Sequence, residues 1–298
     1  MDDEILKKYK KAGEILKEAR NLGLKMIKPG AKILDVVEAV ENKILSLGGE
    51  FAFPVNISIN QNAAHDTADI NDSRTFEEGD LIKLDIGVHV DGYIADSAKT
   101  VSLNSGKEDL IKASETALEE ALKMMRPGVK VYEVSEVIED TIRSMGFNPI
   151  INLTGHGLDR YELHARFEFP NIKNAIDYEL KEGDVFAIEP FSTDGSGKVT
   201  ETNKILIYRY LSDRPVRFPE SRKILELTRE KYHGLPFAKR WLLKEIKISP
   251  IKLNLILRQL SQNGSLYEYP VLKEVQNGFV AQAEHTVVVG DNPIITTA

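Results

Sequence analysis

The chain has 298 residues, of which 42% are hydrophobic and 29% are charged, and its formal net charge is −7. This composition fits a soluble globular protein and argues against a disordered chain. The negative charge argues against a general nucleic-acid or membrane binder. Because the sequence contains no cysteine, it excludes disulfides, thiolate metal sites and a cysteine nucleophile. It shows no secretory signal and no apolar run of the ~18 residues that a membrane span needs, so we expect a cytoplasmic protein.

The N-terminal part of the chain is predicted to be helical. Apolar residues recur with helical spacing over residues 3–28, where Pro29-Gly30 ends the pattern, and a second helix is predicted over about 34–47. The stretch from Phe51 to Arg74 is irregular in pattern.

Residues 81–97 then predict a β-hairpin, with Asp91-Gly92 as a type I′ turn. With that turn, Gly87 faces Asp96. Because side chains alternate along a strand, Asp85 points to the same face as Asp96, about 7 Å away at the backbone. Such a pair lies on a solvated face, or else a divalent cation satisfies it.

The sequence repeats itself after a helix that is predicted over about 107–125. Residues 26–32, Met-Ile-Lys-Pro-Gly-Ala-Lys, are echoed by residues 124–130, Met-Met-Arg-Pro-Gly-Val-Lys. Residues 78–85 are echoed by residues 182–189, so that Glu189 stands where the first copy has Asp85. Two similar halves indicate a domain with pseudo-two-fold symmetry.

This symmetry predicts a partner for Asp96 in the second half. The β-rich run 279–289 carries Glu284, and Ala283-Glu284-His285 is similar to Ala95-Asp96-Ser97. Four acids, two from each half, are therefore expected to converge at the axis that relates the halves.

Histidines divide into candidate ligands and structural residues. His156, flanked by Gly155 and Gly157, is either a hydrogen-bonded structural residue or a ligand, and four nearby carboxylates favour ligation. His285 alternates to the face opposite Glu284, and we take His89 and His233 as structural.

Residues 210–272 form an insertion between the second-half strand and Glu284. Helices are predicted over 220–232 and 250–262, followed by a short strand over 265–269. Helices that end in a small hairpin are typical of a winged-helix module, which binds DNA elsewhere. The alternative is an additional helical lobe at the rim of the main domain, which the acidic net charge favours.

The five residues Asp85, Asp96, His156, Glu189 and Glu284, with the Gly-His-Gly, Ile-Glu-Pro-Phe and Gln-Ala-Glu-His-Thr segments, resemble the methionine aminopeptidases over essentially the whole chain. The resemblance implies an α/β (α+β) fold, the pseudo-two-fold "pita-bread" fold, with an inserted helical, winged-helix-like subdomain. It divides the chain into a catalytic domain, residues 1–209 and 273–298, and an inserted subdomain, residues 210–272. The insertion is similar to the type 2 subclass, and without a long charged N-terminal extension the archaeal form is expected.

By this resemblance, Asp85 binds one divalent metal ion, His156 and Glu189 bind a second, and Asp96 and Glu284 bridge the two. Oxygen-rich sites with one histidine accept Co²⁺, Mn²⁺, Fe²⁺ or Zn²⁺, and the sequence does not choose among them. A water between two cations loses a proton near neutral pH and becomes the nucleophile. Glu189 is expected to carry that proton to the departing amine.

The resemblance also implies roles for two further histidines and an apolar pocket. His65 is expected to contact the scissile peptide nitrogen, and His164 to steady the carbonyl oxygen as it becomes an oxyanion. A loop position without further function is the alternative for His65. The methionine side chain is expected to lie among Phe53, Leu163, Phe191 and Tyr269. The alternative is that these four are ordinary core residues without a role in substrate binding.

The expected activity is removal of N-terminal methionine from peptides and nascent proteins when the second residue is small. An Xaa-Pro peptidase of the same fold is one alternative, although Asp85 comes too early in the chain for the extra domain that such enzymes carry. A metal-free scaffold that binds protein or RNA is another, although no ligand is missing. We expect a monomer that acts on peptides, with the ribosome as a possible partner and without direct nucleic-acid or membrane binding.

Overall fold

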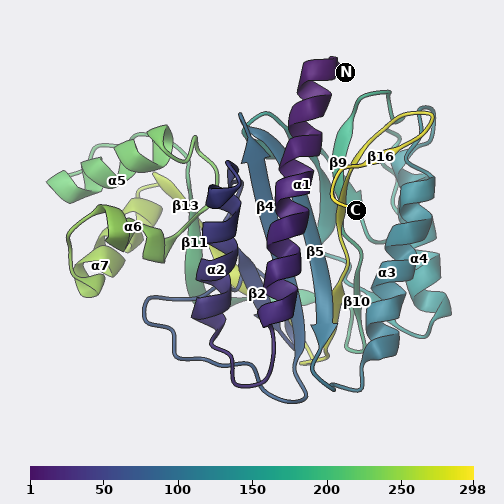
Figure 1. Ribbon diagram of the computed structural model, residues 1–298, viewed down its shortest axis with the longest axis horizontal. Coiled ribbons are helices and arrows are strands. Elements are labelled where there is room, and N and C mark those ends of the chain that lie inside the picture. Colours follow the sequence, from purple (N-terminus) through teal and green to yellow (C-terminus); the bar gives the residue numbers. More distant parts are fainter.

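Two pairs of helices cover the strands of the main body in the computed structural model, which describes residues 1–298 (Figure 1). The first pair is α1 (Asp3–Met26) and α2 (Ile33–Ser46), and the second is α3 (Glu108–Lys123) and α4 (Val131–Ser144). Helix α1 begins where the Asp2 side chain accepts the Glu4 N–H at 2.7 Å. This architecture confirms the predicted mixed α/β fold with two similar halves.

The repeated turns have matching backbone conformations. Gly30 and Gly128, which follow the repeated prolines, have φ angles of 81° and 90°. Gly79 and Gly183, in the second repeated segment, have φ angles of 92° and 87°. Since only glycine adopts such angles without strain, the sequence repeat is a repeat of backbone geometry.

Strands β4 (Leu81–Val90) and β5 (Tyr93–Ser102) form the predicted hairpin, with Gly87 opposite Asp96. Asp91 and Gly92 both have positive φ, at 52° and 87°, as the predicted turn type requires.

The stretch from Phe51 to Arg74 is not wholly irregular, because short strands form where it meets other strands. Both β1 (Glu50–Phe51) and β2 (Asn56–Ile59) pair with β4, and β3 (Asn62–Ala64) pairs with β13 (Leu266–Glu274). These strands depend on partners distant in the sequence, which local patterns do not reveal.

The second half contains a five-stranded and a three-stranded sheet. One has the order β16-β15-β9-β7-β8 and the other β14-β10-β6. Their strands are β6 (Asn148–Pro149), β7 (Thr154–Asp159), β8 (Glu162–Pro170), β9 (Val185–Ile188), β10 (Phe191–Thr193), β14 (Val280–Gln282), β15 (His285–Val288) and β16 (Ile294–Ile295). The β-rich run 279–289 is divided at Ala283 and Glu284 into β14 and β15, which belong to different sheets.

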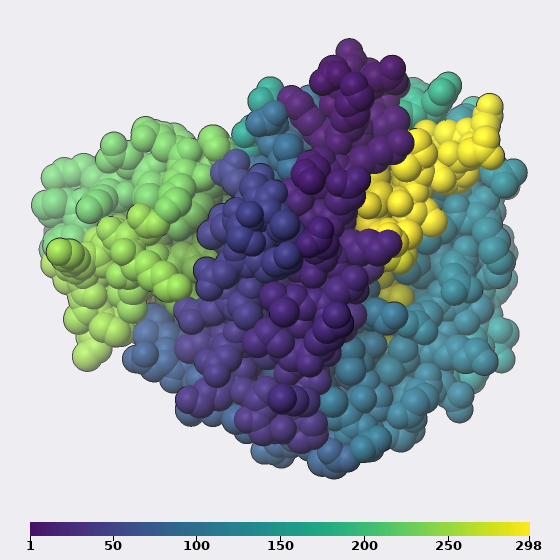
Figure 2. All heavy atoms as spheres, viewed as in Figure 1, coloured from purple at the N-terminus to yellow at the C-terminus, as the bar shows by residue number.

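The insertion forms a lobe beside the first half, drawn in green (Figure 2). It contains α5 (Pro219–Glu230), β12 (Phe237–Ala238), α6 (Lys239–Glu245) and α7 (Pro250–Gln262), of which α6 was not predicted. Thirteen buried residues form a core there. The long strand β11 (Val199–Tyr210) pairs with β12 and β13 and connects the lobe to the main body.

A buried polar contact fixes the lobe against α2. Glu41 of α2 accepts hydrogen bonds from Arg240 and, at 3.2 Å, from the indole N–H of Trp241. No helix combines the length and apolar character needed to cross a bilayer.

Candidate metal centre and active site

One cavity of about 210 Å³ gathers every residue that the sequence predicted for the site. Its lining includes the residues expected to be metal ligands, catalytic histidines and pocket residues, namely Asp85, Asp96, His156, Glu189, Glu284, His65, His164, Phe53, Leu163, Phe191 and Tyr269. The cavity lies where first-half strands meet second-half strands, because Lys99 of β5 pairs with Ala283.

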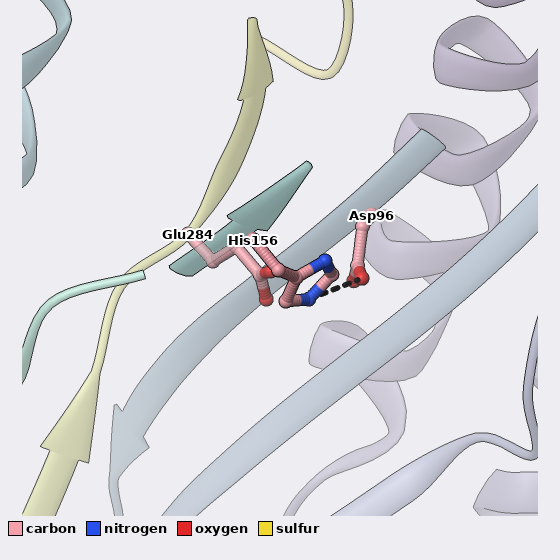
Figure 3. A group of neighbouring side chains, drawn as sticks. All are labelled: Asp96, His156 and Glu284. Atoms are coloured by element: carbon pink, nitrogen blue, oxygen red, sulfur yellow. Dashed lines mark ion pairs between the residues drawn. The ribbon is translucent and has the colours of Figure 1, made fainter. Parts of the chain in front are cut away.

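The centre of the cavity holds three buried donors from different elements. Asp96 comes from β5, His156 from β7, and Glu284 from the segment between β14 and β15 (Figure 3). One ligand atom from each lies within 4.8 Å of the others. Oxygen and imidazole donors at this spacing suit a divalent transition-metal ion.

Close backbone packing places His156 among the acids. A Cβ on Gly155 would lie 2.5 Å from the Ala187 carbonyl oxygen, and one on Gly157 would lie 2.3 Å from that of Ala165. Only glycine at both positions lets β7 approach its neighbours this closely. The sequence Gly-His-Gly is therefore a packing requirement around a functional side chain.

The orientation of the His156 ring leaves one nitrogen for the acids. Nδ1 lies 3.4 Å from the Gly157 carbonyl oxygen, which can only accept a hydrogen bond. Nε2 lies 3.5 Å from Glu189 Oε1 and 3.7 Å from Asp96 Oδ2. Burial lowers the pKa of His156 to about 4, so that the ring is neutral and Nε2 carries a lone pair for a metal.

Two glutamates of the second half lie at breaks between strands. Glu189 separates β9 from β10, where Pro190 has no N–H to continue a ladder. Glu284 separates β14 from β15, and its N–H donates to the Ala98 carbonyl in the first half at 3.1 Å. These breaks turn both side chains into the cavity.

Gln282 connects the two glutamates, although the sequence analysis missed it. Its Nε2 donates to Glu189 Oε2 at 3.3 Å and to Glu284 Oε2 at 3.4 Å. The residue lies two positions before Glu284, so the alternation rule that related Asp85 to Asp96 also places it on that face.

The two halves are held together behind the carboxylates. The Thr286 hydroxyl accepts from the Asp96 N–H at 2.7 Å and donates to the Asp96 carbonyl at 2.9 Å. The Ser97 hydroxyl donates to the Glu284 carbonyl at 2.6 Å. These contacts fix the backbones that carry the two expected bridging ligands.

The buried carboxylates repel one another electrostatically. Burial, followed by the charge of neighbouring acids, raises the pKa values of Asp96, Glu189 and Glu284 well above their ordinary range. Burial raises the pKa of Asp85 to about 7. One oxygen each of Asp85 and Asp96 is buried without a hydrogen-bond partner. Four crowded acids, two of them with an unpartnered oxygen, and a neutral imidazole fit divalent cations.

The two histidines expected to act on substrate flank this cluster. His65, at a φ of 62°, directs Nδ1 to the Pro270 carbonyl oxygen at 3.2 Å, and burial lowers its pKa to about 4. The ring of His164 lies 4.4 Å from that of His156. His164 is part of the cavity lining, where desolvation, followed by the charge of His156, lowers its pKa.

Aromatic and aliphatic side chains form part of the cavity wall. Phe53 packs over Gly87, where a Cβ would lie 2.2 Å from the ring. Lining residues that the sequence did not single out are Asn56, Ala64, Asn152, Leu153, Thr154, Ile207 and Pro236. They come from β2, β3, β7, β11 and loops, where no local pattern marks them.

The histidines taken as structural lie outside the cavity lining. His89 accepts the Gly92 N–H at 3.2 Å and stabilises the hairpin turn. His285 hydrogen-bonds Thr297 at 2.7 Å, and the ring of His233 lies 4.4 Å from Tyr161.

Comparison with known proteins gives one family and a set of close relatives. Residues 7–291 match metallopeptidase family M24. A methionine aminopeptidase of Archaeoglobus fulgidus is 51% identical over 291 residues, covering 98% of this chain and 97% of the relative. One from Thermococcus onnurineus is 50% identical over 280 residues, covering 94% of both chains.

Solved structures share the fold at lower identity. A thermophilic Arx1 superposes with a TM-score of 0.87 at 20% identity, covering 99% of this chain and 91% of that one. The methionine aminopeptidase of Thermotoga maritima superposes with a TM-score of 0.72 at 23% identity, covering 100% of this chain and 98% of that one. A prolidase from Pyrococcus furiosus superposes with a TM-score of 0.65 at 18% identity. The match covers 100% of this chain and 65% of the prolidase. The prolidase therefore has additional chain, as expected for the Xaa-Pro alternative.

Proposed function

This chain belongs to metallopeptidase family M24, and from that premise we propose how its buried cavity removes the first residue of a peptide. The activity is that of a methionyl aminopeptidase, which hydrolyses the peptide bond after an N-terminal methionine. The observation that carries the proposal is the convergence of five metal-ligand side chains, two histidines and an apolar pocket on one cavity.

We assign the metal ligands as two sets that share the bridging acids. Asp85 would hold one divalent ion and His156 with Glu189 the other, while Asp96 and Glu284 would contact both. Co²⁺, Mn²⁺, Fe²⁺ and Zn²⁺ all accept such donors. When bound, the ions supply Lewis-acid chemistry, polarising oxygen and making water acidic near neutral pH.

Glu189 is the proton carrier in this proposal. Burial and the nearby charge of Asp96 raise its pKa, so that its carboxylate takes up a proton more readily than an exposed one. Gln282 holds its other edge at 3.3 Å. Glu189 would accept a proton from the attacking water and return it to the amine as the peptide bond breaks.

His65 is suited to bind the scissile amide because of its tautomer. The Pro270 carbonyl can only accept, so Nδ1 carries the proton and Nε2 is an acceptor. The peptide N–H is the donor that matches Nε2. His164, neutral because of its lowered pKa, donates one N–H and would stabilise the developing negative charge on the carbonyl oxygen.

The enclosed cavity selects the amino end and the second residue. We propose that Phe53, Leu163, Phe191 and Tyr269 surround the methionine side chain. The second side chain passes the crowded rim beside the carboxylates, so a small residue is accepted and an acidic one is both too large and repelled. A free amino group approaches the acid cluster favourably.

A three-peptide assay tests the proposal. Protein loaded with Co²⁺ or Mn²⁺ is incubated with Met-Ala-Ser, Met-Asp-Asp and acetylated Met-Ala-Ser, and free methionine is measured. We expect methionine from Met-Ala-Ser alone. Comparable release from all three would contradict both the selection of a small second residue and the requirement for a free amino end.

The enzyme acts on peptides, and we propose newly made polypeptides in the cytoplasm as the natural source of N-terminal methionine. A monomer that meets chains at the ribosome fits this role. Co-sedimentation of the purified protein with ribosomes, compared with free protein at matched salt, tests the association.

We propose residues 210–272 as a separate subdomain, because α5, α6 and α7 share a core of their own.

A further inference from the structure

A second recess, of about 230 Å³, borders the site cavity and has no role in the mechanism above. The two hollows share three lining residues, His65, Asn152 and Tyr269. We call the second hollow the outer recess. Since Tyr269 lines both, its ring is the wall between the proposed methionine pocket and the outer recess.

The walls of the outer recess are already ordered. The ring of Tyr269 packs edge to face against His65 at 5.2 Å and against Tyr267 at 4.9 Å. The Asn152 amide is held at both ends, since Nδ2 donates to the Val199 carbonyl at 2.9 Å and Oδ1 accepts the Val199 N–H at 3.0 Å. A ligand group would therefore enter a preformed hollow.

The outer recess carries one charged side chain, the carboxylate of Glu201 on β11. Glu201 is exposed, and the nearest lysine along its strand, Lys204, pairs with Asp66 instead, at 2.7 Å. His65 adds no charge, because its pKa is lowered to about 4. The guanidinium of Arg209 already lies over the Tyr267 ring, 5.9 Å from its centroid, so the Glu201 carboxylate is the group of this recess that favours a cation.

The proposed substrate path leads into this recess. Residues of an extended peptide alternate in direction and advance about 3.3 Å each, so the first and third side chains lie on one side, about 7 Å apart. The first side chain occupies the methionine pocket in the function proposed above. His65, which contacts the scissile nitrogen in that function, lines both hollows, so the chain after the scissile bond would place the third side chain beside the outer recess.

We propose that the outer recess binds the third residue of the peptide substrate, and that Glu201 makes it selective for lysine or arginine. This inference depends on the proposed function for the placement of the first residue. The ammonium or guanidinium group would pair with the Glu201 carboxylate. Because the pair is partly exposed, a ~3- to 10-fold effect on kcat/KM is expected.

A peptide series tests the proposal. The substrates are Met-Ala-Xaa-Ala-Ala amides, in which Xaa is Lys, Ala or Glu, and kcat/KM is measured with metal-loaded protein. We expect the order Lys, Ala, Glu, with the lysine advantage reduced at high ionic strength. E201Q should remove the ranking, and E201K should reverse it. Glu182 is an exposed acid on the turn before β9, and the control variant E182Q should keep the wild-type order.

The outcomes separate this inference from the activity itself. Cleavage of all three peptides at equal rates by the wild type, or an unchanged lysine-to-glutamate ratio in an active E201K, overturns the subsite. No methionine from the alanine peptide would instead contradict the proposed function. If circular dichroism shows that E201K does not fold, the E201Q variant decides the question. The proposal requires that E201Q cleave the three peptides with similar kcat/KM. If E201Q keeps the wild-type order of the peptides, the proposal is overturned.

Discussion

The two halves of the molecule bring acids to one cavity through different backbones. In the first half, Asp85 and Asp96 lie within unbroken strands, β4 and β5, joined by a two-residue turn. In the second half, Glu189 and Glu284 lie at breaks between short strands, with the whole insertion between them in the sequence. The hairpin sets the register of the first pair, to which Thr286 of the second half adds hydrogen bonds at Asp96, whereas the second pair depends on tertiary contacts throughout.

The two halves are therefore similar in fold but differ in the contacts that hold their acidic residues in place. The hairpin holds Asp85 and Asp96 through its own ladder. The second half requires glycines that let β7 approach, the amide of Gln282, and bonds to the first half. We therefore expect first-half variants to act mainly through the lost ligand, and second-half variants to act also through its supports.

Removal of Asp96 should have the largest effect. Asp96→Ala takes away an expected bridging ligand, so activity should fall by about 10³-fold or more, with reduced metal content and an intact circular dichroism spectrum. Asp91→Asn, in the turn of the same hairpin, is the matched control and should remain active. Near-normal activity of Asp96→Ala at saturating metal would contradict the assignment.

Removal of the two substrate histidines should affect catalysis without affecting the metal. His65→Ala and His164→Ala should each lower kcat by about 10²–10³-fold, the range for a lost positioning or oxyanion group. Elemental analysis should find wild-type metal content in both. A loss of metal in His164→Ala would mean that this residue belongs to the ligand shell.

Gln282 tests the supports of the second half. Gln282→Met keeps the shape of the side chain and removes the donors to Glu189 and Glu284. Metal affinity, measured by calorimetry on metal-free protein, should fall by about 10- to 100-fold, as for other residues that orient ligands. Gln262→Met, an exposed residue of α7, is the control. Equal affinities in the two variants would remove Gln282 from the account.

The effect of pH on metal stabilisation should be the smallest. The pKa of Asp85 is raised to about 7, so without metal its contribution favours the folded state below an unfolded pKa near 4 and is lost as pH rises through 7. Metal offsets this loss and binds ionised ligands more tightly. The rise in Tm on adding Mn²⁺ should therefore be larger at pH 8 than at pH 5. A rise independent of pH would contradict the cluster's titration.

The first-half ligands could be predicted from local sequence because the hairpin encodes them. The turn Asp91-Gly92 sets the register, and alternation then places Asp85 and Asp96 on one face. Glu189 and Glu284 were found only through the internal repeat, since their own segments are not regular strands. The break at Glu189 has a local signal in Pro190, which cannot donate to a strand ladder.

Features that depend on distant partners were missed. The short strands β1, β2 and β3 form only against β4 and β13, and α6 is a single short helix held by the contact of Arg240 with Glu41. Gln282 did have a local signal, its spacing from Glu284. The outer recess is formed by β11, β13 and two loops together, and no single segment indicates it.

Counting the metal ions in variants from each half tests the central claim most directly. Metal-free wild-type protein, titrated with Mn²⁺ or Co²⁺ by calorimetry, should bind two ions per chain. Asp85→Ala should retain the ion held by His156 and Glu189, and His156→Ala should retain the ion held by Asp85, giving one ion each. A single ion in the wild type, or two ions in either variant, would contradict a dinuclear site built from both halves.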